Sequence, residues 1–404
     1  MRSRAPRHLA RPGTAREIHG CWGIPRLFGR GTTRMCDVVV IGGGVIGLSI
    51  AYELAESGLS VRLLEQGQIG QEASWAGAGI LPPGNPDWAR TAEARLRAAS
   101  AQLWPQWAEK LESQTGINTG YVRCGGLEVR LGSPPSELAE EAEGWRAEQV
   151  AIEVLSPDDV RERFPGVSAD VTAAYYLPDL AQVRNPWLLT ALRTACVQHG
   201  VELFTGCPVT SLERNGERVH TARTPGGDFS ASHFVIAAGA WSRELIQQAG
   251  WRLDVQPVRG QIVLLERLPL PFPCVVQSGT RYVVPRRDGR ILVGSTEEHV
   301  GYDKRNTSAA VSELLAFATS ISPELREARF NRAWAGLRPY VNQGRPFIGC
   351  IPTLTNVCVA TGHYRAGLQL SPITAVLIRQ LITGEPVSLP HDCHRYGTHH
   401  DRVS

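Results

Sequence analysis

The chain has 404 residues, of which 43% are hydrophobic, 20% are charged and 41 are glycine, and this composition excludes disordered, collagen-like and disulfide-dense classes. Its length suits two globular domains. The net charge of +3 is uneven, because residues 1–34 carry eight arginines and one acid, Glu17, so the rest of the chain is net negative by four charges. We therefore expect no basic surface for nucleic acid or anionic lipid.

Residues 1–34 are expected to be a disordered or mis-assigned N-terminal extension. An Arg-rich segment with few acids can also be a transit peptide, but Met35 directly precedes the first predicted strand, which favours a mis-assigned start. The nine cysteines form no C-x-x-C pair and no secretory signal is visible, which indicates a reducing compartment and a cytoplasmic protein. The longest apolar segment, 38–52, is shorter than a membrane span of roughly 20 residues, so no membrane insertion is expected.

A strand, a helix and a second strand open the folded part of the chain. Apolar residues 38–41 precede a helical pattern that ends at Gly58, and a short strand follows at 60–65, which predicts parallel strands joined by a crossover helix. Residues 133–163 are acidic and predicted to be mostly helical, and strands with an Asp288–Gly289 hairpin turn dominate 255–296. We also predict helices at 88–115, 187–200, 308–320 and from about 368, and strands at 125–131, 201–206, 233–242 and 356–362.

Three glycines separate the first strand from its helix in the pattern G-x-G-x-x-G. Gly42 permits a tight turn, Gly44 lets the backbone approach a pyrophosphate, and Gly47 allows close packing of helix on strand. Glu65 ends the next strand, where a carboxylate can accept hydrogen bonds from a ribose diol. The pattern indicates a dinucleotide site, and the alternative is a glycine-rich turn that binds no ligand.

The segment after Glu65 distinguishes between dinucleotides. Residues 68–81, "QIGQEASWAGAGIL", are expected to form a loop of small residues, and the segment 233–242, "HFVIAAGAWS", gives a second apolar strand that ends on a glycine, Gly239. Two glycine-terminated strands allow one extended dinucleotide to lie across both loop ends, which fits FAD better than NAD.

Six motifs carry a resemblance to a known family. They are "VVVIGGGVIGLSIAYELAESG", "EASWAGAGILPP", "VIAAGAWS", "YVVPRRDGRILVGST", "WAGLRP" and "ATGHYRAGLQLSPITA". In their order and spacing, from about residue 36 to 385, the chain resembles the glycine oxidase branch of the D-amino-acid oxidase family of FAD-dependent oxidoreductases. The resemblance implies an α/β fold with a Rossmann-like, glutathione-reductase-like FAD-binding domain on a parallel sheet, and a second α+β substrate domain on a mostly antiparallel sheet.

Because parallel-sheet patterning recurs in separate parts of the chain, the FAD-binding domain is expected to be discontinuous. We place it at 35–85, 180–250 and 335–385, and the substrate-binding domain at 86–179 and 251–334. Residues 386–404 are expected to be a C-terminal tail, and its "HDCHRYGTHH" run lacks the ligand spacing of a metal site.

The resemblance also implies the site residues. Arg338 would grip the substrate carboxylate, Tyr282 would add a second hydrogen bond, and Arg365 would lie near the substrate mouth. The alternatives are a surface salt bridge for either arginine and a core tyrosine. The residues expected to contact FAD are Gly42, Gly44, Val45, Ile46, Gly47, Glu65, Gln66, Ala73, Ser74, Ala78, Gly79, Ile80, Val209, Gly239, Trp241, Gly362, Tyr364, Arg365, Ala366, Gly367 and Leu368.

Further expectations concern the run "GHYRAG" and the way FAD is held. The backbone at Gly362 and Gly367 is expected to pass close to the flavin, while His363 and Tyr364 would pack or hydrogen-bond locally. Because no cysteine stands at the "GLRP" position, FAD is expected to bind non-covalently.

The expected reaction is oxidation of glycine, a small D-amino acid or a secondary amino acid to the imine, with hydride passing to the flavin and O2 reoxidising it to give H2O2. Glu297 or Glu298 would assist the loss of the amine proton if either faces the pocket. The imine would hydrolyse or enter thiazole synthesis for thiamine, and family members are often homotetramers. The alternatives are a dehydrogenase of the same fold with a non-oxygen acceptor, and a flavin-binding protein that oxidises no amine.

Overall fold

The computed structural model describes residues 35–132 and 136–393, and the statements below concern these residues. The expected N-terminal extension, 1–34, lies outside them. The first sheet has the order β10-β11-β12-β1-β2-β9, with β19 paired to β12 and to β18. Its strands are β1 (Cys36–Ile41), β2 (Val61–Leu64), β9 (Glu202–Phe204), β10 (Ser211–Asn215), β11 (Arg218–Thr224), β12 (Gly227–Ile236), β18 (Phe347–Cys350) and β19 (Val357–Thr361).

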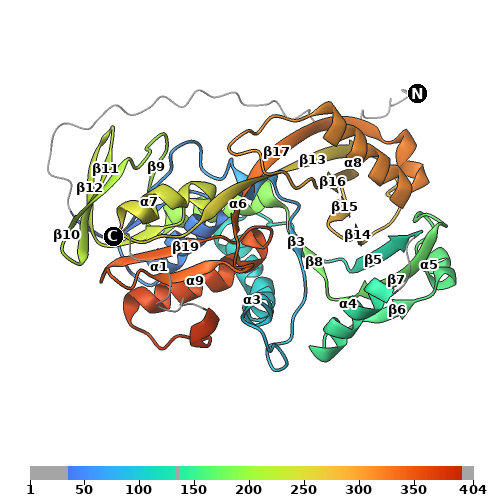
Figure 1. Cartoon of the computed structure of the whole chain (residues 1–404), viewed down its shortest axis with the longest axis horizontal. Helices are drawn as coiled ribbons and strands as arrows, with labels where there is room; N and C mark the ends of the chain where they lie inside the picture. The colour runs from blue at the N-terminus through green and yellow to red at the C-terminus, as the bar shows by residue number, and fades with distance from the viewer. Residues whose placement is uncertain (1–34, 133–135, 394–404) are drawn as a thin grey trace, which may run out of the picture. The chain divides into compact units, whose positions relative to one another are not determined.

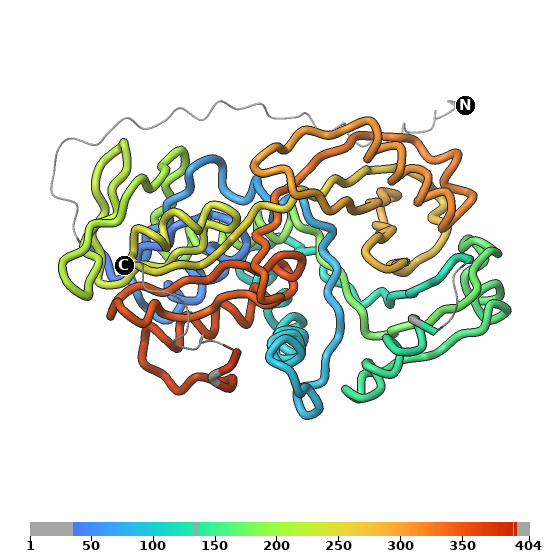
Figure 2. Tube along the Cα trace, viewed as in Figure 1, coloured from blue at the N-terminus to red at the C-terminus, as the bar shows by residue number. Residues whose placement is uncertain are grey.

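The centre of this sheet is parallel and is assembled from distant parts of the chain. Strands β9, β2, β1, β12 and β19 pair in parallel in that order. Three neighbouring strands come from distant parts of the chain: in Figure 1 β1 is blue, β12 is yellow-green and β19 is red. The tube in Figure 2 shows the same three chain regions meeting. The confirmed fold class is therefore an α/β fold with a Rossmann-like parallel sheet.

Helices and strands bury both faces of this sheet. Val38 and Val40 of β1 face one apolar core, while Val39 and Ile41 face another, so the four consecutive apolar residues of the sequence are explained. Helices α1, α3, α6 and α9 contribute to the first core and α7 to the second. The helices are α1 (Val45–Glu56), α2 (Ala73–Ala76), α3 (Ala92–Thr115), α4 (Ser136–Ala147), α5 (Pro157–Arg163), α6 (Asn185–Gln198), α7 (Ser242–Gln248), α8 (Ser308–Ile321) and α9 (Gly367–Thr383), with 3-10 turns η1 (Gly239–Trp241), η2 (Pro323–Glu327) and η3 (His391–Cys393).

The second sheet has the order β17-β13-β16-β15-β14-β5-β7-β6 and is antiparallel except where β14 meets β5. One face packs on α5 and α8, and the other turns Ile262, Tyr282 and Val284 toward α4 and the cavity described below. Its strands are β5 (Gly126–Leu131), β6 (Glu153–Leu155), β7 (Val171–Leu177), β13 (Val255–Glu266), β14 (Val275–Ser278), β15 (Arg281–Pro285), β16 (Arg290–Gly294) and β17 (Arg329–Val341); β3 (Ile80–Leu81), β8 (Ala181–Gln182) and β4 (Val122–Arg123) form a small third sheet.

The predicted helices and strands are present, with three departures. The strand predicted at 233–242 ends earlier, at Ile236 of β12, and Gly239–Trp241 form the 3-10 turn η1 before α7. Residues 133–163 contain a strand, β6, between α4 and α5, because Val154 pairs with Tyr175 of β7. The "WAGLRP" motif lies inside the long strand β17, which the sequence analysis did not predict as a strand. The boundaries of the two predicted domains stay a prediction. No helix in the described part of the chain is both long and apolar enough to cross a bilayer.

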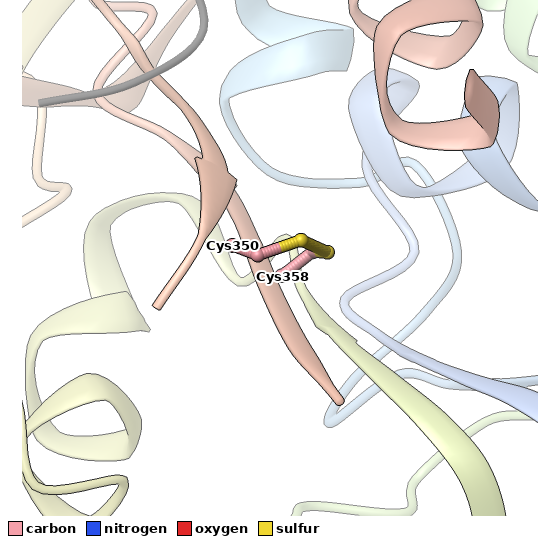
Figure 3. The surroundings of a disulfide bond; sticks show 2 residues. All are labelled: Cys350 and Cys358. Atoms are coloured by element: carbon pink, nitrogen blue, oxygen red, sulfur yellow. A yellow bond between two sulfur atoms is a disulfide. The ribbon is translucent and has the colours of Figure 1, made fainter. Parts of the chain in front are cut away.

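The cysteines depart from the expectation of free thiols. Cys350 and Cys358 are neighbours in the antiparallel pairing of β18 with β19, and their sulfurs form a disulfide (Figure 3). The sequence spacing gave no sign of this pair, because strand register brings the two residues together. The free cysteines among the described residues are Cys36, Cys124, Cys196, Cys207, Cys274 and Cys393.

Candidate functional site

A cavity of about 800 Å³ brings the predicted FAD and substrate residues together. It lies at the end of β1 and the start of α1, and it is also lined by α2, the turn after β12, β17 and the start of α9. The predicted residues that line it are Gly42, Gly44, Val45, Ile46, Glu65, Gln66, Ala73, Ser74, Ala78, Gly79, Ile80, Val209, Gly239, Trp241, Tyr282, Arg338, Tyr364, Arg365, Ala366, Gly367 and Leu368.

Two predicted FAD contacts, Gly47 and Gly362, do not line the cavity, and packing explains both glycines. A Cβ on Gly47 would lie 1.9 Å from the carbonyl oxygen of Gly42, so a side chain there would push α1 away from the turn. Gly362 has φ +77° and its Cβ would lie 2.9 Å from Val341. The prediction that the Gly362 backbone approaches the flavin stays a prediction, and its neighbours Thr361 and His363 both line the cavity.

The turn after β1 is suited to a pyrophosphate. Gly42 has φ +112°, and a Cβ there would lie 2.4 Å from the carbonyl oxygen of Ala237, so the ends of β1 and β12 meet without an intervening side chain. Helix α1 begins directly after Gly44, and the free N–H groups and positive dipole of its first turn favour an anion. Ser74 accepts a hydrogen bond from the N–H of Val45 at 2.9 Å and ties α2 to this turn.

Glu65 is buried at the cavity wall and holds two loops. Its Oε2 accepts a hydrogen bond from the N–H of Gly43 at 2.7 Å, and its Oε1 accepts one from Gly67 at 2.7 Å. Each carboxylate oxygen keeps further lone-pair capacity toward the cavity, as a ribose diol requires. The carboxylate, the glycine turn and the helix terminus together fit FAD.

Two buried polar side chains fix the small-residue loop that follows α2. Asn185 at the start of α6 donates to the carbonyl oxygens of Ser74 at 2.9 Å and Gly77 at 2.8 Å. Arg286 donates to the carbonyl oxygen of Ala78 at 2.7 Å and to two further neutral oxygens in β8 and the residue after it. Burial lowers the pKa of Arg286 to about 10, so this side chain stays a cation behind the cavity wall.

Arg338 lies on β17 at the wall formed by the second sheet. Its Nη1 donates to the carbonyl oxygen of Thr296 at 3.0 Å, and its Nη2 donates to Oγ of Ser295 at 2.5 Å. Both acceptors are neutral, and no carboxylate of the described residues forms an ion pair with Arg338. These contacts leave three of the five guanidinium N–H groups for a ligand.

Two further groups lie against the Arg338 guanidinium. It lies on the backbone of β13, where a Cβ on Gly260 would come within 2.2 Å of Nη2. Its Cζ also lies 6.0 Å from the ring centroid of Tyr364. The absence of a side chain at Gly260 therefore determines where the charge sits.

Tyr282 lies on the same wall. In β15 it pairs with Gly294 of β16, and a Cβ on Gly294 would lie 2.7 Å from the tyrosine hydroxyl. The ring is buried and also lines the cavity, so its position is compatible with both the core-tyrosine alternative and the predicted contact with the substrate.

The run from His363 to Arg365 separates into three environments. The exposed Arg365 donates to the carbonyl oxygen of Thr280 at 2.6 Å at the cavity edge, as expected for the mouth. His363 is buried with Nε2 3.0 Å from Oγ1 of Thr374, and burial lowers its pKa to about 3, so the imidazole is neutral. Burial and the nearby Glu297 raise the pKa of Tyr364 to about 12.

Neither glutamate considered as a proton acceptor lines the cavity. Glu298 pairs with Arg259 at 2.5 Å and accepts a hydrogen bond from Gln261 at 2.8 Å. Burial raises the pKa of Glu298, but the hydrogen bonds from Arg259, Thr296 and Gln261 outweigh it and hold that pKa below its usual value. Glu297 is exposed. The condition set for their role as proton acceptors, that one of them faces the pocket, is therefore not met in this structure.

Several cavity residues were missed by reasoning from the sequence. Gly336 lies so close to α2 that its Cβ would come within 2.5 Å of the Cβ of Ala76. At Gly336 and Gly260, a glycine inside a run of β-forming residues was the sequence signal that could have identified a site residue. The other missed residues that matter here are Gly77, Ile262, Gln277 and Ser295.

Within the described residues, no group of three or more His, Cys, Asp or Glu side chains lies close enough to hold a metal ion. Residues 394–404, which carry most of the histidine-rich tail, lie outside that part of the chain.

The parallel sheet carries a dinucleotide-binding turn, and the antiparallel sheet carries Arg338, which has no acidic partner among the described residues. Together they are typical of a flavin-dependent oxidoreductase with separate cofactor and substrate sheets. The family described as FAD dependent oxidoreductase, DAO, matches residues 37–381. The chain belongs to this family, which confirms the predicted family and its FAD dependence.

Similar proteins agree with this assignment. The chain is 38% identical over 357 residues to the glycine oxidase of Pseudomonas putida, covering 88% of this chain and 96% of that protein. It is 36% identical over 359 residues to the bifunctional protein ThiO/ThiG of Synechocystis, covering 87% of this chain and 52% of that protein. The crystal structure of glycine oxidase from Geobacillus kaustophilus superposes with a TM-score of 0.86 at 30% identity, covering 90% of this chain and 98% of that one.

Proposed function

We propose that the protein is an amino-acid oxidase that oxidises glycine or another small amino acid to its imine. The observation that carries this proposal is Arg338: a guanidinium on the cavity wall, held by neutral oxygens, has three N–H groups free for a carboxylate. A guanidinium already paired with an acid would not serve in this way.

Bound FAD supplies the hydride acceptor and, after reduction, the site that reacts with O2. The residues that would hold it are the Gly42–Gly44 turn, Glu65 and the small-residue loop after α2. The protein's own contribution is orientation, since Arg338 and Tyr282 would hold the carboxylate from one wall and leave the substrate Cα facing the cavity. Neither Glu297 nor Glu298 lines the cavity, so the amine proton would be lost to water.

The side chains around Arg338 support the proposal of a small substrate. Tyr282, Tyr364 and Ile262 line the cavity beside Arg338. A carboxylate bound to Arg338 would leave the substrate Cα close to these side chains, which favours glycine, sarcosine or D-alanine over larger amino acids.

A role in thiamine synthesis is part of the proposal. It is supported by the similarity to ThiO/ThiG, of which this chain matches about half. The imine formed from glycine would then pass to thiazole synthesis instead of hydrolysing. A dehydrogenase with a non-oxygen acceptor is the less favoured alternative.

Three further expectations belong with this proposal. FAD is expected to bind non-covalently. Among the described residues, the cysteine that lines the cavity is Cys207, and its backbone N–H donates to the carbonyl oxygen of Glu65. Cys207 therefore lies at the dinucleotide turn and not beside Arg338. The cytoplasm stays the expected location; six of the eight described cysteines are free thiols, which supports it, whereas the Cys350–Cys358 disulfide does not. A homotetramer is the expected assembly, which light scattering would test.

A substrate panel tests the proposal. Purified FAD-loaded enzyme is mixed with glycine, sarcosine, D-alanine, D-proline and L-alanine in air, and H2O2 is measured. We expect turnover of glycine and the small members of the panel. A yellow protein that forms no peroxide with any of them would contradict the proposal, and flavin reduction without peroxide would favour the dehydrogenase.

A further inference from the structure

Ser295 occupies an unusual position directly after β16. It is buried, with 5% of its surface exposed, and it lines the cavity. Its Oγ accepts a hydrogen bond from Nη2 of Arg338 at 2.5 Å. Because a guanidinium only donates, the serine must be the acceptor in this contact, and its own O–H proton remains to be donated elsewhere.

Among the described residues, that proton has no acceptor. Arg338 is the hydrogen-bond partner of the Ser295 side chain among the described residues. A buried hydroxyl loses free energy when its proton is unbonded, so an acceptor from outside the chain is favoured at this point of the cavity.

The segment that carries Ser295 is anchored. The next residue, Thr296, accepts from Arg338 through its carbonyl oxygen and from the N–H of Gln261 through Oγ1 at 2.9 Å. Oγ1 of Thr296 also donates to Glu298 at 2.5 Å. The serine hydroxyl therefore has a fixed position relative to the guanidinium.

The neighbouring groups carry the same kind of donor. Tyr282 of β15 pairs with Gly294 of β16, the residue before Ser295, and its hydroxyl lies against that glycine. The hydroxyls of Tyr282 and Ser295 and the guanidinium of Arg338 thus lie on one patch of the cavity wall. Three donors around one point match the several lone pairs of a carboxylate.

We propose that Ser295 is a substrate-binding residue whose hydroxyl donates a hydrogen bond to the carboxylate held by Arg338. The inference rests on the proposed function, because it takes the ligand of Arg338 to be a carboxylate. Ser295 thus connects Arg338 to the ligand. Its hydroxyl oxygen accepts a hydrogen bond from the guanidinium, and its O–H donates one to the carboxylate that the guanidinium binds. The hydrogen bond within the protein polarises the hydroxyl and strengthens the one to the ligand.

Acetate isolates this contact, because it has the carboxylate of glycine and no amine. Its dissociation constant is measured on FAD-loaded enzyme from the change it causes in the flavin absorbance. Ser295→Ala should raise this constant about tenfold, as expected for loss of a hydrogen bond to a charged acceptor. Ser371→Ala is the matched control, since Ser371 is also buried, donates to the carbonyl oxygen of Leu368 and lies outside the cavity lining.

The outcomes are separable. An acetate constant for Ser295→Ala within twofold of the wild type, with Ser371→Ala also unchanged, would overturn the inference. A wild-type flavin that glycine, sarcosine and D-alanine all fail to reduce would instead contradict the proposed function, whatever the serine variant does.

The acetate complex of the wild-type enzyme tests direct contact and needs no variant to fold. We expect Oγ of Ser295 about 2.7 Å from an acetate oxygen. A separation beyond hydrogen-bond distance, or a water between them, would show that Ser295 only positions Arg338 and would overturn the proposed contact.

Discussion

At the scale of single residues, the site depends on a cation whose hydrogen-bond partners in the protein are all neutral. Arg338 donates to Ser295 and to the carbonyl of Thr296, and it lies against the backbone of Gly260 and near the ring of Tyr364. Arg259, a few residues away on the neighbouring strand, is paired with Glu298 and Asp303. The contrast between these two arginines identifies which one is free to bind an anionic ligand.

Replacing Arg338 should abolish recognition of the carboxylate. Arg338→Ala removes the charge-assisted hydrogen bonds, and we expect KM for glycine to rise about 100-fold or more. Arg332→Ala is the control, since Arg332 lies on the same strand and is exposed. Steady-state peroxide assays with both variants check this, and an unchanged KM in Arg338→Ala would contradict the assignment.

At the scale of elements, strands β13 and β17 show what the sequence could and could not predict. The motif "WAGLRP" identified Arg338 through family resemblance, but a glycine and a proline inside six residues concealed the strand. In the structure Pro339 faces Pro257 in the pairing of β17 with β13. Gly260 was not predicted as a site residue, because its importance comes from the neighbouring strand and not from its own motif.

A methyl group on Gly260 should disturb the site without touching the dinucleotide turn. In Gly260→Ala the new Cβ would lie 2.2 Å from Arg338 Nη2, so the guanidinium must move. We expect KM for glycine to rise at least tenfold while FAD affinity changes less than threefold. Gly144→Ala, on an exposed helix with no atom within 4 Å of its Cβ, is the control. An unaltered KM in Gly260→Ala would contradict this account.

The link between His363 and α9 predicts a pH dependence of stability. Burial lowers the pKa of His363 to about 3, below the ordinary value of about 6.5 that it regains on unfolding. The unfolded chain therefore binds more protons below pH 6.5, and stability that is present above pH 6.5 is lost as the pH falls toward 3. This residue alone should reduce the free energy of unfolding by about 1 kcal/mol between pH 6.5 and pH 5.5.

Denaturant unfolding at those two pH values checks the prediction. His363→Asn should lose about 1 kcal/mol less than the wild type across this interval, because it lacks the titrating group. His220→Asn, an exposed histidine on β11, should behave as the wild type does. An identical pH dependence in wild type and His363→Asn would show that the buried imidazole is not responsible.

At the scale of the whole molecule, the cavity is assembled from chain segments that are far apart in the sequence. Strands β1, β12 and β19 belong to one sheet (Figure 1) and lie next to the dinucleotide turn with the start of α9, and residues of β15 and β17 line the same cavity. The order of glycine-rich motifs predicted most of this, because each motif ends a strand at the same edge of the sheet. Three features could not be predicted, since each follows from strand register or side-chain pairing. They are the contact of Ser295 with Arg338, the Cys350–Cys358 disulfide and the ion pair of Glu298 with Arg259.

FAD should stabilise the fold as a ligand of the native state. At a free FAD concentration 100 times its dissociation constant, the free energy of unfolding should rise by about 2.7 kcal/mol over that of the apoprotein. Denaturant unfolding with and without FAD measures this difference. A stability independent of FAD would mean that the cavity does not bind it.

The central claim is that this cavity presents a small amino acid to FAD and that O2 completes the cycle. The most direct measurement mixes the FAD-loaded enzyme with glycine without oxygen, follows the absorbance of the oxidised flavin, and then admits air. We predict that glycine bleaches the flavin, and that air restores the absorbance with formation of one H2O2 per flavin reoxidised. A flavin spectrum that glycine, sarcosine and D-alanine all leave unchanged would contradict the claim.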